Sequence, residues 1–308
     1  MTRALVTGGR GFVGRQIVAA LAAHGFEVAA TTSSKPDPLI TGARWFTVDL
    51  MDPAATRQVL RDWQPEILVH AAWDTTHGSF WTSEANYDWV SASLNLIRSF
   101  TAEGGRRFVG VGSCAEYDWN AGTCFEASTP LQPWHCYGDC KATVFRLSSR
   151  FAADRGISFA WARIFLVYGP HEGEARLVPS VVRGLLRGET VKVSLGTQIR
   201  DVMHVADAGE AIATLAAGDV VGPVNIGTGE QVSLADVVGL IGTLTGHSDL
   251  IAYGALPLRP DDPPVLVPHV TRLRHEVGYR PRHSLQTGLA DAIAWWQQKQ
   301  HDNAQIGD

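Results

Sequence analysis

Short apolar runs alternate with longer segments of helical period through the first half of the chain. The pattern predicts strands and helices in turn, at residues 4–7 (strand), 13–23 (helix), 27–30 (strand), 45–48 (strand), 54–63 (helix), 67–70 (strand), 83–102 (helix), 107–111 (strand), 137–153 (helix) and 158–164 (strand). Such alternation indicates right-handed βαβ crossovers, and therefore a parallel sheet covered by helices. We predict an α/β fold with a Rossmann-type, doubly wound sheet.

The pattern loosens after Gly169-Pro170, where proline, glycine and arginine cluster around 169–200 and again around 254–283. Segments 205–217 and 224–226 regain helix and strand patterns and indicate a return to the main sheet. We therefore expect a smaller, interleaved C-terminal substrate lobe. The predicted division is a dinucleotide-binding domain of 1–168 plus about 201–230 and a substrate lobe of 169–200 and 231–308.

Charge and hydropathy narrow the possible partners. The 308 residues carry a formal net charge of -5, with both signs mixed along the chain and no basic stripe. No apolar run reaches the length of a membrane span. We expect neither a nucleic acid nor a membrane partner. The first predicted strand begins close to Met1 and leaves no room for a cleavable leader, so a cytoplasmic protein is expected.

The cysteines are interpreted as thiols rather than disulfides, because all four lie in one short window of a large chain. Cys136 and Cys140 are one helical turn apart beside His135. The Cys-x-x-Cys spacing of structural zinc sites is absent, however, so no metal site is expected.

A glycine-rich segment follows the first predicted strand, with Gly8, Gly11 and Gly14 at the turn into the first predicted helix. Glycine lets the backbone turn tightly and approach a pyrophosphate, and the amides at a helix N-terminus favour anions. The segment predicts a dinucleotide site.

Tyr137 and Lys141 stand one helical turn apart, so a phenol and an ammonium share one face of a helix. Lowering a tyrosine pKa from near 10 to near 7 needs about 4 kcal/mol of preferential stabilisation of the phenolate. An ammonium about 4 Å away in partly shielded surroundings supplies that much. Ser113 follows an apolar strand at the edge where parallel sheets place ligands, and its hydroxyl suits a carbonyl oxygen. These three residues form a candidate catalytic set.

Further motifs complete a pattern that resembles the extended short-chain dehydrogenase/reductases. The resemblance extends over nearly the whole chain and is carried by Gly8-x-x-Gly11-x-x-Gly14, Asp49-Leu50, His70-Ala71-Ala72, Ser113, Tyr137-x-x-x-Lys141, Arg163 to Tyr168-Gly169-Pro170, Arg200-Asp201 with His204 and Asp207, and Asn225 to Gly229. Members of that family mostly act on nucleotide-diphosphate sugars, so such a sugar is the implied partner.

The resemblance implies roles for particular residues. Ser113, Tyr137 and Lys141 would be catalytic. The cofactor would contact Gly8, Arg10, Gly11, Phe12, Val13, Gly14, Thr31, Ser33, Asp49, Leu50, Ala71, Ala72, Tyr137, Lys141 and Phe165. The substrate would contact Glu116, His135, Arg176, Arg200 and Arg259, with the guanidinium groups of Arg200 and Arg259 on the diphosphate.

The segment after the second predicted strand bears on the choice of cofactor. An NAD enzyme usually carries an acidic residue there to hold the ribose hydroxyls. This chain has Thr31-Thr-Ser33-Ser-Lys35 instead, and Arg10 in the glycine turn resembles a basic residue of NADP-using relatives. We expect NADP(H), with NAD as the alternative.

The reaction is expected to be simple hydride chemistry on the sugar. Dehydratase relatives carry an acidic residue where this chain has Ala115, and Glu116 lies one place off. Fucose-forming relatives carry a Cys/His pair where this chain has Ala115 and Arg176, although Cys114 and His135 are near. An asparagine common before the Tyr-Gly-Pro turn is replaced by Leu166.

NADPH-dependent reduction of a 4-keto-6-deoxy nucleotide sugar, with Tyr137 as proton donor, is therefore the first expectation. A nucleotide-sugar 4-epimerase with bound NAD+ is the alternative, and a non-catalytic NADP-sensing scaffold is a second one. Relatives pair two helices across a dimer interface, so the helices near 83–102 and 137–153 predict a homodimer.

Overall fold

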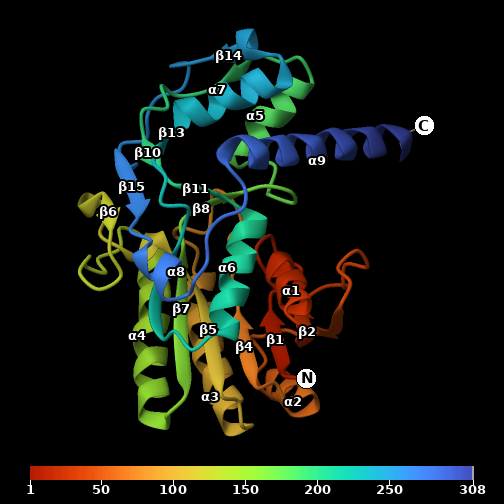
Figure 1. The fold of residues 1–308 in the computed structure, drawn as a ribbon, viewed down its shortest axis with the longest axis vertical. Coiled ribbons are helices and arrows are strands. Elements are labelled where there is room, and N and C mark those ends of the chain that lie inside the picture. The colour runs from red at the N-terminus through yellow and green to blue at the C-terminus, as the bar shows by residue number, and fades with distance from the viewer. Residues whose placement is uncertain (307–308) are drawn as a thin grey trace.

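A seven-stranded parallel sheet forms the centre of the larger part of the molecule (Figure 1), as the sequence predicts. The computed structural model describes residues 1–306. The strand order is β12-β7-β5-β4-β1-β2-β3, and every neighbouring pair is parallel. The order reverses at β1, which is the mark of a doubly wound sheet. The strands are β1 (Arg3–Thr7), β2 (Glu27–Thr32), β3 (Ala43–Thr47), β4 (Ile67–His70), β5 (Arg107–Ser113), β7 (Ser158–Ile164) and β12 (Gly222–Ile226).

Helices cover both faces of the sheet. One face buries α1 (Gly14–Ala23) and α6 (Val205–Ala217) in a core that includes Ile17 and Ile212. The opposite face carries α2 (Pro53–Trp63), α3 (Ala85–Ala102) and α4 (Cys136–Arg155), whose apolar side chains share a second core. The sequence places these helices correctly to within a few residues.

The start of α2 shows why such elements begin where they do. Asp52 accepts hydrogen bonds from the amides of Ala54 and Ala55, at 2.8 Å and 3.1 Å, and so satisfies two unpaired donors of the first turn. Pro53 occupies the first helical position, where its missing N–H costs nothing.

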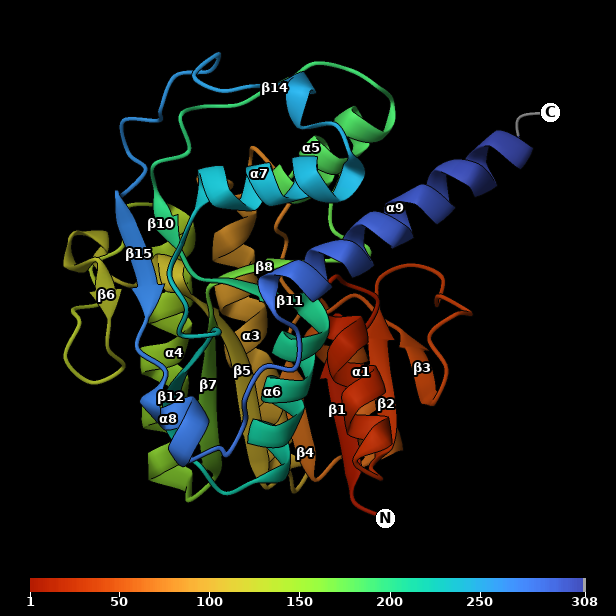
Figure 2. The ribbon, with the colours of Figure 1, turned by 45° about the horizontal axis from the view of Figure 1, so that its top comes forward.

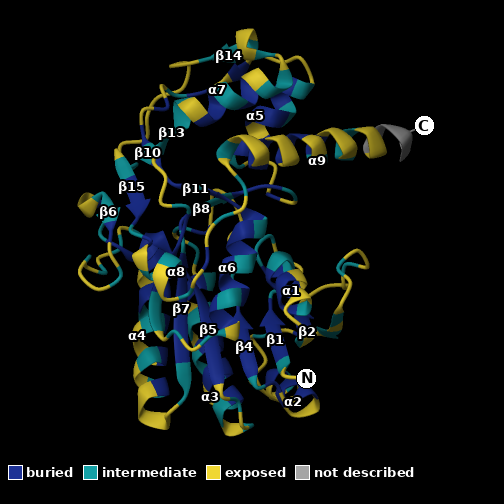
Figure 3. Ribbon diagram, in the orientation of Figure 1, coloured by how far each residue is buried: buried dark blue, intermediate teal, exposed yellow. Residues whose placement is uncertain are grey.

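A smaller lobe lies beyond the carboxyl ends of the sheet strands (Figures 1 and 2). Its core packs α5 (Leu177–Leu186), α7 (Leu234–Thr245) and α9 (Leu285–Ile306). Figure 3 shows that the part of α9 coloured there mixes buried, intermediate and exposed residues. A four-stranded sheet joins β6 (Thr123–Cys124), β10 (Ile199–Arg200), β13 (Val232–Ser233) and β15 (Val265–Pro268). The remaining elements are β8 (Leu166–Tyr168) paired with β11 (Val202–His204), β9 (Val191–Lys192) paired with β14 (Ile251–Ala252), α8 (Thr271–His275) and the short helices η1 (Cys114–Glu116), η2 (Trp119–Ala121) and η3 (Ser248–Leu250).

The chain passes between the two parts several times. After α5 and β10 it returns through α6 and β12 to the main sheet, and it then re-enters the lobe at β13. Among the described helices, none combines the length and apolar character needed to cross a membrane.

Candidate functional site

The glycine turn between β1 and α1 is too crowded for side chains. Gly8 has a φ of +69°, and a Cβ on Gly14 would lie 2.1 Å from the carbonyl oxygen of Gly8. Beside the turn lies a cavity of about 740 Å³. It is lined by nine of the predicted cofactor residues, namely Gly8, Arg10, Gly11, Thr31, Ser33, Asp49, Leu50, Ala71 and Ala72. The exposed backbone of the turn and the size of the cavity fit a dinucleotide.

Other predicted cofactor residues lie around this cavity without lining it. Phe12, Val13 and Gly14 lead into α1, and Phe165 is buried in an aromatic cluster with Tyr117. The turn's own backbone, rather than these side chains, borders the cavity.

The end of β2 presents hydroxyls and a guanidinium instead of a carboxylate. Arg10 donates a hydrogen bond of 2.6 Å from Nη1 to the hydroxyl oxygen of Ser34. The nearby carboxylate of Asp37 is engaged by Arg15 at 3.0 Å. This rim of the cavity therefore carries donors suited to an anionic group.

The candidate catalytic residues meet where β5 and α4 come together. Ser113 ends β5, and Tyr137 and Lys141 lie in the first turns of α4. Burial raises the pKa of Tyr137 above its usual value, and a hydrogen bond with the Ser113 hydroxyl acts in the opposite direction. The phenol is therefore protonated at neutral pH.

Lys141 is buried between the end of β5 and Trp73. Its ammonium donates to the carbonyl oxygen of Val111 at 2.9 Å and lies 3.9 Å from the ring centroid of Trp73. Burial lowers the pKa of Lys141 to about 7, while the charge of Glu116 opposes that change. Burial disfavours the charged form of both Tyr137 and Lys141, and the lowering of the Tyr137 pKa by Lys141 stays a prediction.

Glu116 is a structural residue, which corrects its prediction as a substrate contact. Its side chain is fully buried, accepts hydrogen bonds from the Ser113 amide at 2.8 Å and from Trp161, and forms an ion pair of 2.7 Å with Arg163. Every one of these partners lies inside the fold. The carboxylate therefore holds the turn that carries Ser113 and does not reach a substrate.

A second cavity, of about 680 Å³, lies between the sheet edge and the smaller lobe. Three predicted substrate residues line it: His135, Arg200 and Arg259. Arg176 stands beside it between the lining residues Ala175 and Leu177, and its guanidinium donates to the carbonyl oxygen of Thr75 at 3.3 Å.

The walls of this cavity are largely apolar near the catalytic residues. Trp81, Trp119 and Leu166 line it together with Cys114. Burial raises the pKa of the Cys114 thiol to about 12, so this residue is not an acid or base at neutral pH. An apolar wall of this kind suits the carbon face of a sugar ring.

The sequence model of the NAD dependent epimerase/dehydratase family matches residues 4–227. The chain belongs to this family. The UDP-glucose 4-epimerase of Corynebacterium glutamicum is 27% identical, over 94% of this chain and 94% of its own length. UDP-glucose 4-epimerase of Streptomyces lividans is also 27% identical, over 94% of this chain and 95% of its own. The resemblance to the extended dehydrogenase/reductases is thereby confirmed.

Solved structures of other proteins match the fold of this epimerase/dehydratase family member over almost the whole chain. The UDP-glucose 4-epimerase of Thermotoga maritima, with UDP-glucose, superposes with a TM-score of 0.86 at 24% identity, covering 97% of this chain and 100% of the other. MoeE5 in complex with UDP-glucose and NAD gives a TM-score of 0.84 at 30% identity, covering 97% and 99%.

The structure adds residues to the family member's site that the sequence did not single out. Asp262 forms an ion pair with Arg200 and accepts a hydrogen bond of 2.9 Å from Gln198. Asp261 lies 3.7 Å from Nε2 of His135. The two carboxylates directly follow Arg259-Pro260. This cluster of charged residues in a proline-rich loop is the feature of the sequence from which they could have been predicted as site residues.

Proposed function

We propose that this family member is a nucleotide-sugar 4-epimerase. The observation that carries the proposal is the position of Tyr137 between the two cavities. Its ring centroid is 6.2 Å from that of Trp73, which lines the cavity beside the glycine turn, called here the dinucleotide cavity. It is 5.8 Å from the ring centroid of Trp81, which lines the second cavity. The full-length similarity to UDP-glucose 4-epimerases supports the same reaction.

The chemistry follows from the groups at this junction. A bound nicotinamide dinucleotide supplies hydride transfer. The Tyr137 hydroxyl exchanges a proton with the C4 oxygen of the sugar, and the Ser113 hydroxyl donates a hydrogen bond to the same oxygen as charge develops there. Arg200 and Arg259 suit the diphosphate, because a guanidinium offers paired donors to phosphate oxygens. Arg200 pairs with Asp262 and keeps further N–H donors for this contact.

A second candidate function is the NADPH-dependent reduction of a 4-keto-6-deoxy sugar nucleotide. Two observations favour it. The Arg10–Ser34 pair occupies the position where NAD enzymes usually carry a carboxylate. The protonated Tyr137 is also ready to give a proton to a ketone oxygen, whereas an alcohol substrate first requires its phenolate.

Product analysis separates the two functions. The purified protein is incubated with UDP-glucose without added coenzyme, and separately with NADPH and a 4-keto-6-deoxy sugar nucleotide. An epimerase forms UDP-galactose and releases NAD+ on denaturation. A reductase instead oxidises NADPH in proportion to the ketone consumed.

Tyr137→Phe is expected to lower either turnover about 10²- to 10⁴-fold. Firm dinucleotide binding without either reaction would contradict both functions and would favour the non-catalytic NADP-sensing scaffold.

The coenzyme preference is tested by fluorescence titration with NADH and NADPH. If Arg10 binds a 2′-phosphate, Arg10→Ala weakens NADPH binding about ten-fold and leaves NADH binding unchanged. Arg106→Ala is the matched control, because Arg106 is an exposed arginine paired with Glu66 near the amino ends of the sheet strands. Equal loss of both coenzymes in Arg10→Ala would count against NADP selectivity.

A further inference from the structure

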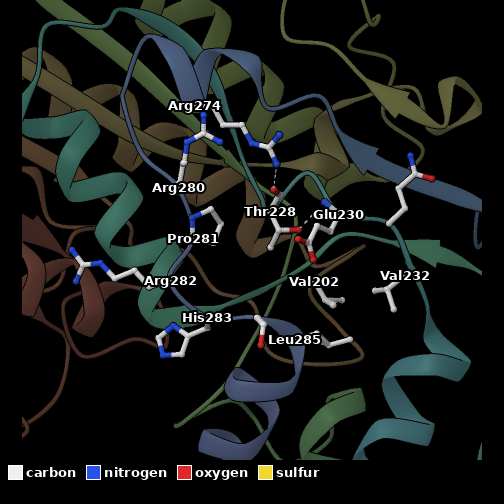
Figure 4. Close-up of a pocket in the computed structure, with 12 residues that line it drawn as sticks. Val202, Thr228, Glu230, Val232, Arg274, Arg280, Pro281, Arg282, His283 and Leu285 are labelled. Carbon is white, nitrogen blue, oxygen red and sulfur yellow. Dashed lines mark hydrogen bonds between the residues drawn. The ribbon is translucent and has the colours of Figure 1, made fainter.

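A third cavity, of about 510 Å³, opens on the surface where the lobe meets the main sheet (Figure 4). Its walls come from β11, the turn at 228–232 and the segment 280–285 that leads into α9, together with Arg274. None of its lining residues lines the dinucleotide cavity or the second cavity. The proposed catalytic chemistry makes no use of it.

The lining of this cavity carries an excess of positive charge. Arg274, Arg280 and Arg282 are among the residues that line it, with Glu230 as the one carboxylate, but the side chain of Arg282 points away from the cavity toward Glu210 of α6 (Figure 4). Like charges placed together in a cavity are unfavourable unless an anion neutralises them. The arrangement therefore points to a negatively charged ligand.

The three guanidinium groups have few partners. Within residues 1–306, Arg280 makes no ion pair or hydrogen bond through its side chain, and it is exposed. Arg282 has only a long contact of 3.4 Å with Glu210. Arg274 donates one bond, of 2.7 Å, to the carbonyl oxygen of Thr228, as Figure 4 shows. A guanidinium has five N–H donors, so Arg274 and Arg280 keep most of theirs available to a ligand in the cavity.

Both walls of the cavity are held rigidly from behind. The buried carboxylate of Asp207 accepts hydrogen bonds from the Tyr279 hydroxyl at 2.8 Å and from the amides of Arg282 and His283 at 3.0 Å each. On the opposite wall, Asp201 accepts from the amides at 228 and 229, at 2.9 Å and 2.6 Å. The segment that displays Arg280 and Arg282 is thus fixed before any ligand arrives, which reduces the entropy cost of binding.

We infer that this basic cavity is a binding site for a small phosphate-bearing molecule, separate from the catalytic site. Guanidinium groups bind phosphate oxygens through paired, charge-assisted hydrogen bonds. The volume falls within the range of sites that hold small metabolites. The inference stands whichever of the two proposed reactions the protein performs.

The test is calorimetric titration of the full-length protein with inorganic pyrophosphate. Wild type is compared with Arg280→Gln, with Arg259→Gln in the second cavity, and with Arg106→Gln as the surface control. A separate site predicts that Arg280→Gln weakens one binding event at least about five-fold. Arg106→Gln should leave all binding unchanged, and Arg259→Gln should leave that event intact.

Two results would overturn the inference. One is pyrophosphate binding by Arg280→Gln that equals the wild-type binding. The other is loss of all binding in Arg259→Gln, which would assign the anion to the catalytic site. Arg280 is exposed, so its variant should melt at the wild-type temperature, and a matched melting curve shows that the comparison is between folded proteins.

Discussion

At the residue scale, Gly138 allows the candidate catalytic residues Ser113 and Tyr137 to lie close together. A Cβ at this position would lie 2.2 Å from the carbonyl oxygen of Ala115. Only a residue without a side chain lets the first turn of α4 press against the turn that follows Ser113. The separation between the Ser113 and Tyr137 hydroxyls therefore depends on Gly138 having no Cβ atom.

Gly138→Ala is expected to lose about 1–3 kcal/mol of stability through overpacking and about 100-fold in kcat through displacement of Tyr137. Urea unfolding and steady-state kinetics measure the two effects. Gly173→Ala is the matched control, since a Cβ there meets nothing within 4 Å. Wild-type kinetics in Gly138→Ala would show that the close contact does not set the geometry.

Lys141 makes stability depend on pH in a defined direction. Burial lowers its pKa from 10.5 to about 7. Between these values the unfolded chain holds more protons at this site than the folded chain, so the contribution of Lys141 to the free energy of unfolding rises with pH. Below about pH 7 both states are charged and this contribution is at its lowest.

The comparison with Lys141→Met isolates this effect in urea unfolding from about pH 6.5 to 8.5. The stability of the wild type should rise relative to the variant across that interval. Above pH 8.5, Cys114 and Tyr137 act in the opposite direction. Burial raises the pKa of both groups, so their contribution to the free energy of unfolding falls as the pH rises. Parallel curves for the two proteins would show that Lys141 is not desolvated.

The sequence singles out Ser113, Tyr137 and Lys141 as candidate catalytic residues because their spacing and their place after a strand are local features. It misjudged Glu116, whose partners Trp161 and Arg163 are more than forty residues away along the chain. A carboxylate near the active site and a carboxylate buried behind it have the same local pattern. Only the tertiary fold distinguishes them.

At the scale of elements, α3 and α4 form the outer layer of one sheet face. Tyr87 on α3 is 63% exposed and Leu147 on α4 is 50% exposed, so apolar groups face outward from both helices. We propose that this layer pairs with a second copy of the chain. Helix α4, which carries the candidate catalytic residues Tyr137 and Lys141, would then be part of the interface.

Leu147→Asp tests this pairing, because a charge placed at a buried interface opposes association. Light scattering after gel filtration should find a dimer for the wild type and a monomer for Leu147→Asp. Leu39→Asp, at a loop leucine that is 81% exposed, should stay dimeric. A monomeric wild type would contradict the proposal.

Long elements were predictable and short ones were not. The main-sheet strands and their helices carry clear periodic patterns, whereas β9, β10, β13 and β14 have two residues each. Two residues show no period, and their pairing depends on segments far away in sequence. The smaller lobe was therefore visible in the sequence only as a loss of regular pattern.

At the scale of the whole molecule, both the chain before loop 254–262 and the chain after it contribute to the smaller lobe. Before that loop, β10 belongs to the lobe and β12 to the main sheet. After it, β15 pairs with β10 and β6, and α9 completes the core of the lobe. The segments before and after the loop are therefore held together by strand pairing and by the packing of α9.

Limited proteolysis in the 254–262 loop should therefore leave two fragments that remain bound to each other. Denaturing gels would show both bands, while gel filtration under native conditions would show one peak at the original volume. The fragments should separate only in denaturant. Release of the C-terminal fragment without denaturant would show that the pairing of β15 and the packing of α9 are weak.

The position of β12 also has a consequence for how the protein is made. Its partner β7 is synthesised first, and residues 165–221 must follow before β12 can cover the outer edge of the sheet. During that interval the growing chain carries an open edge, which invites pairing with other chains.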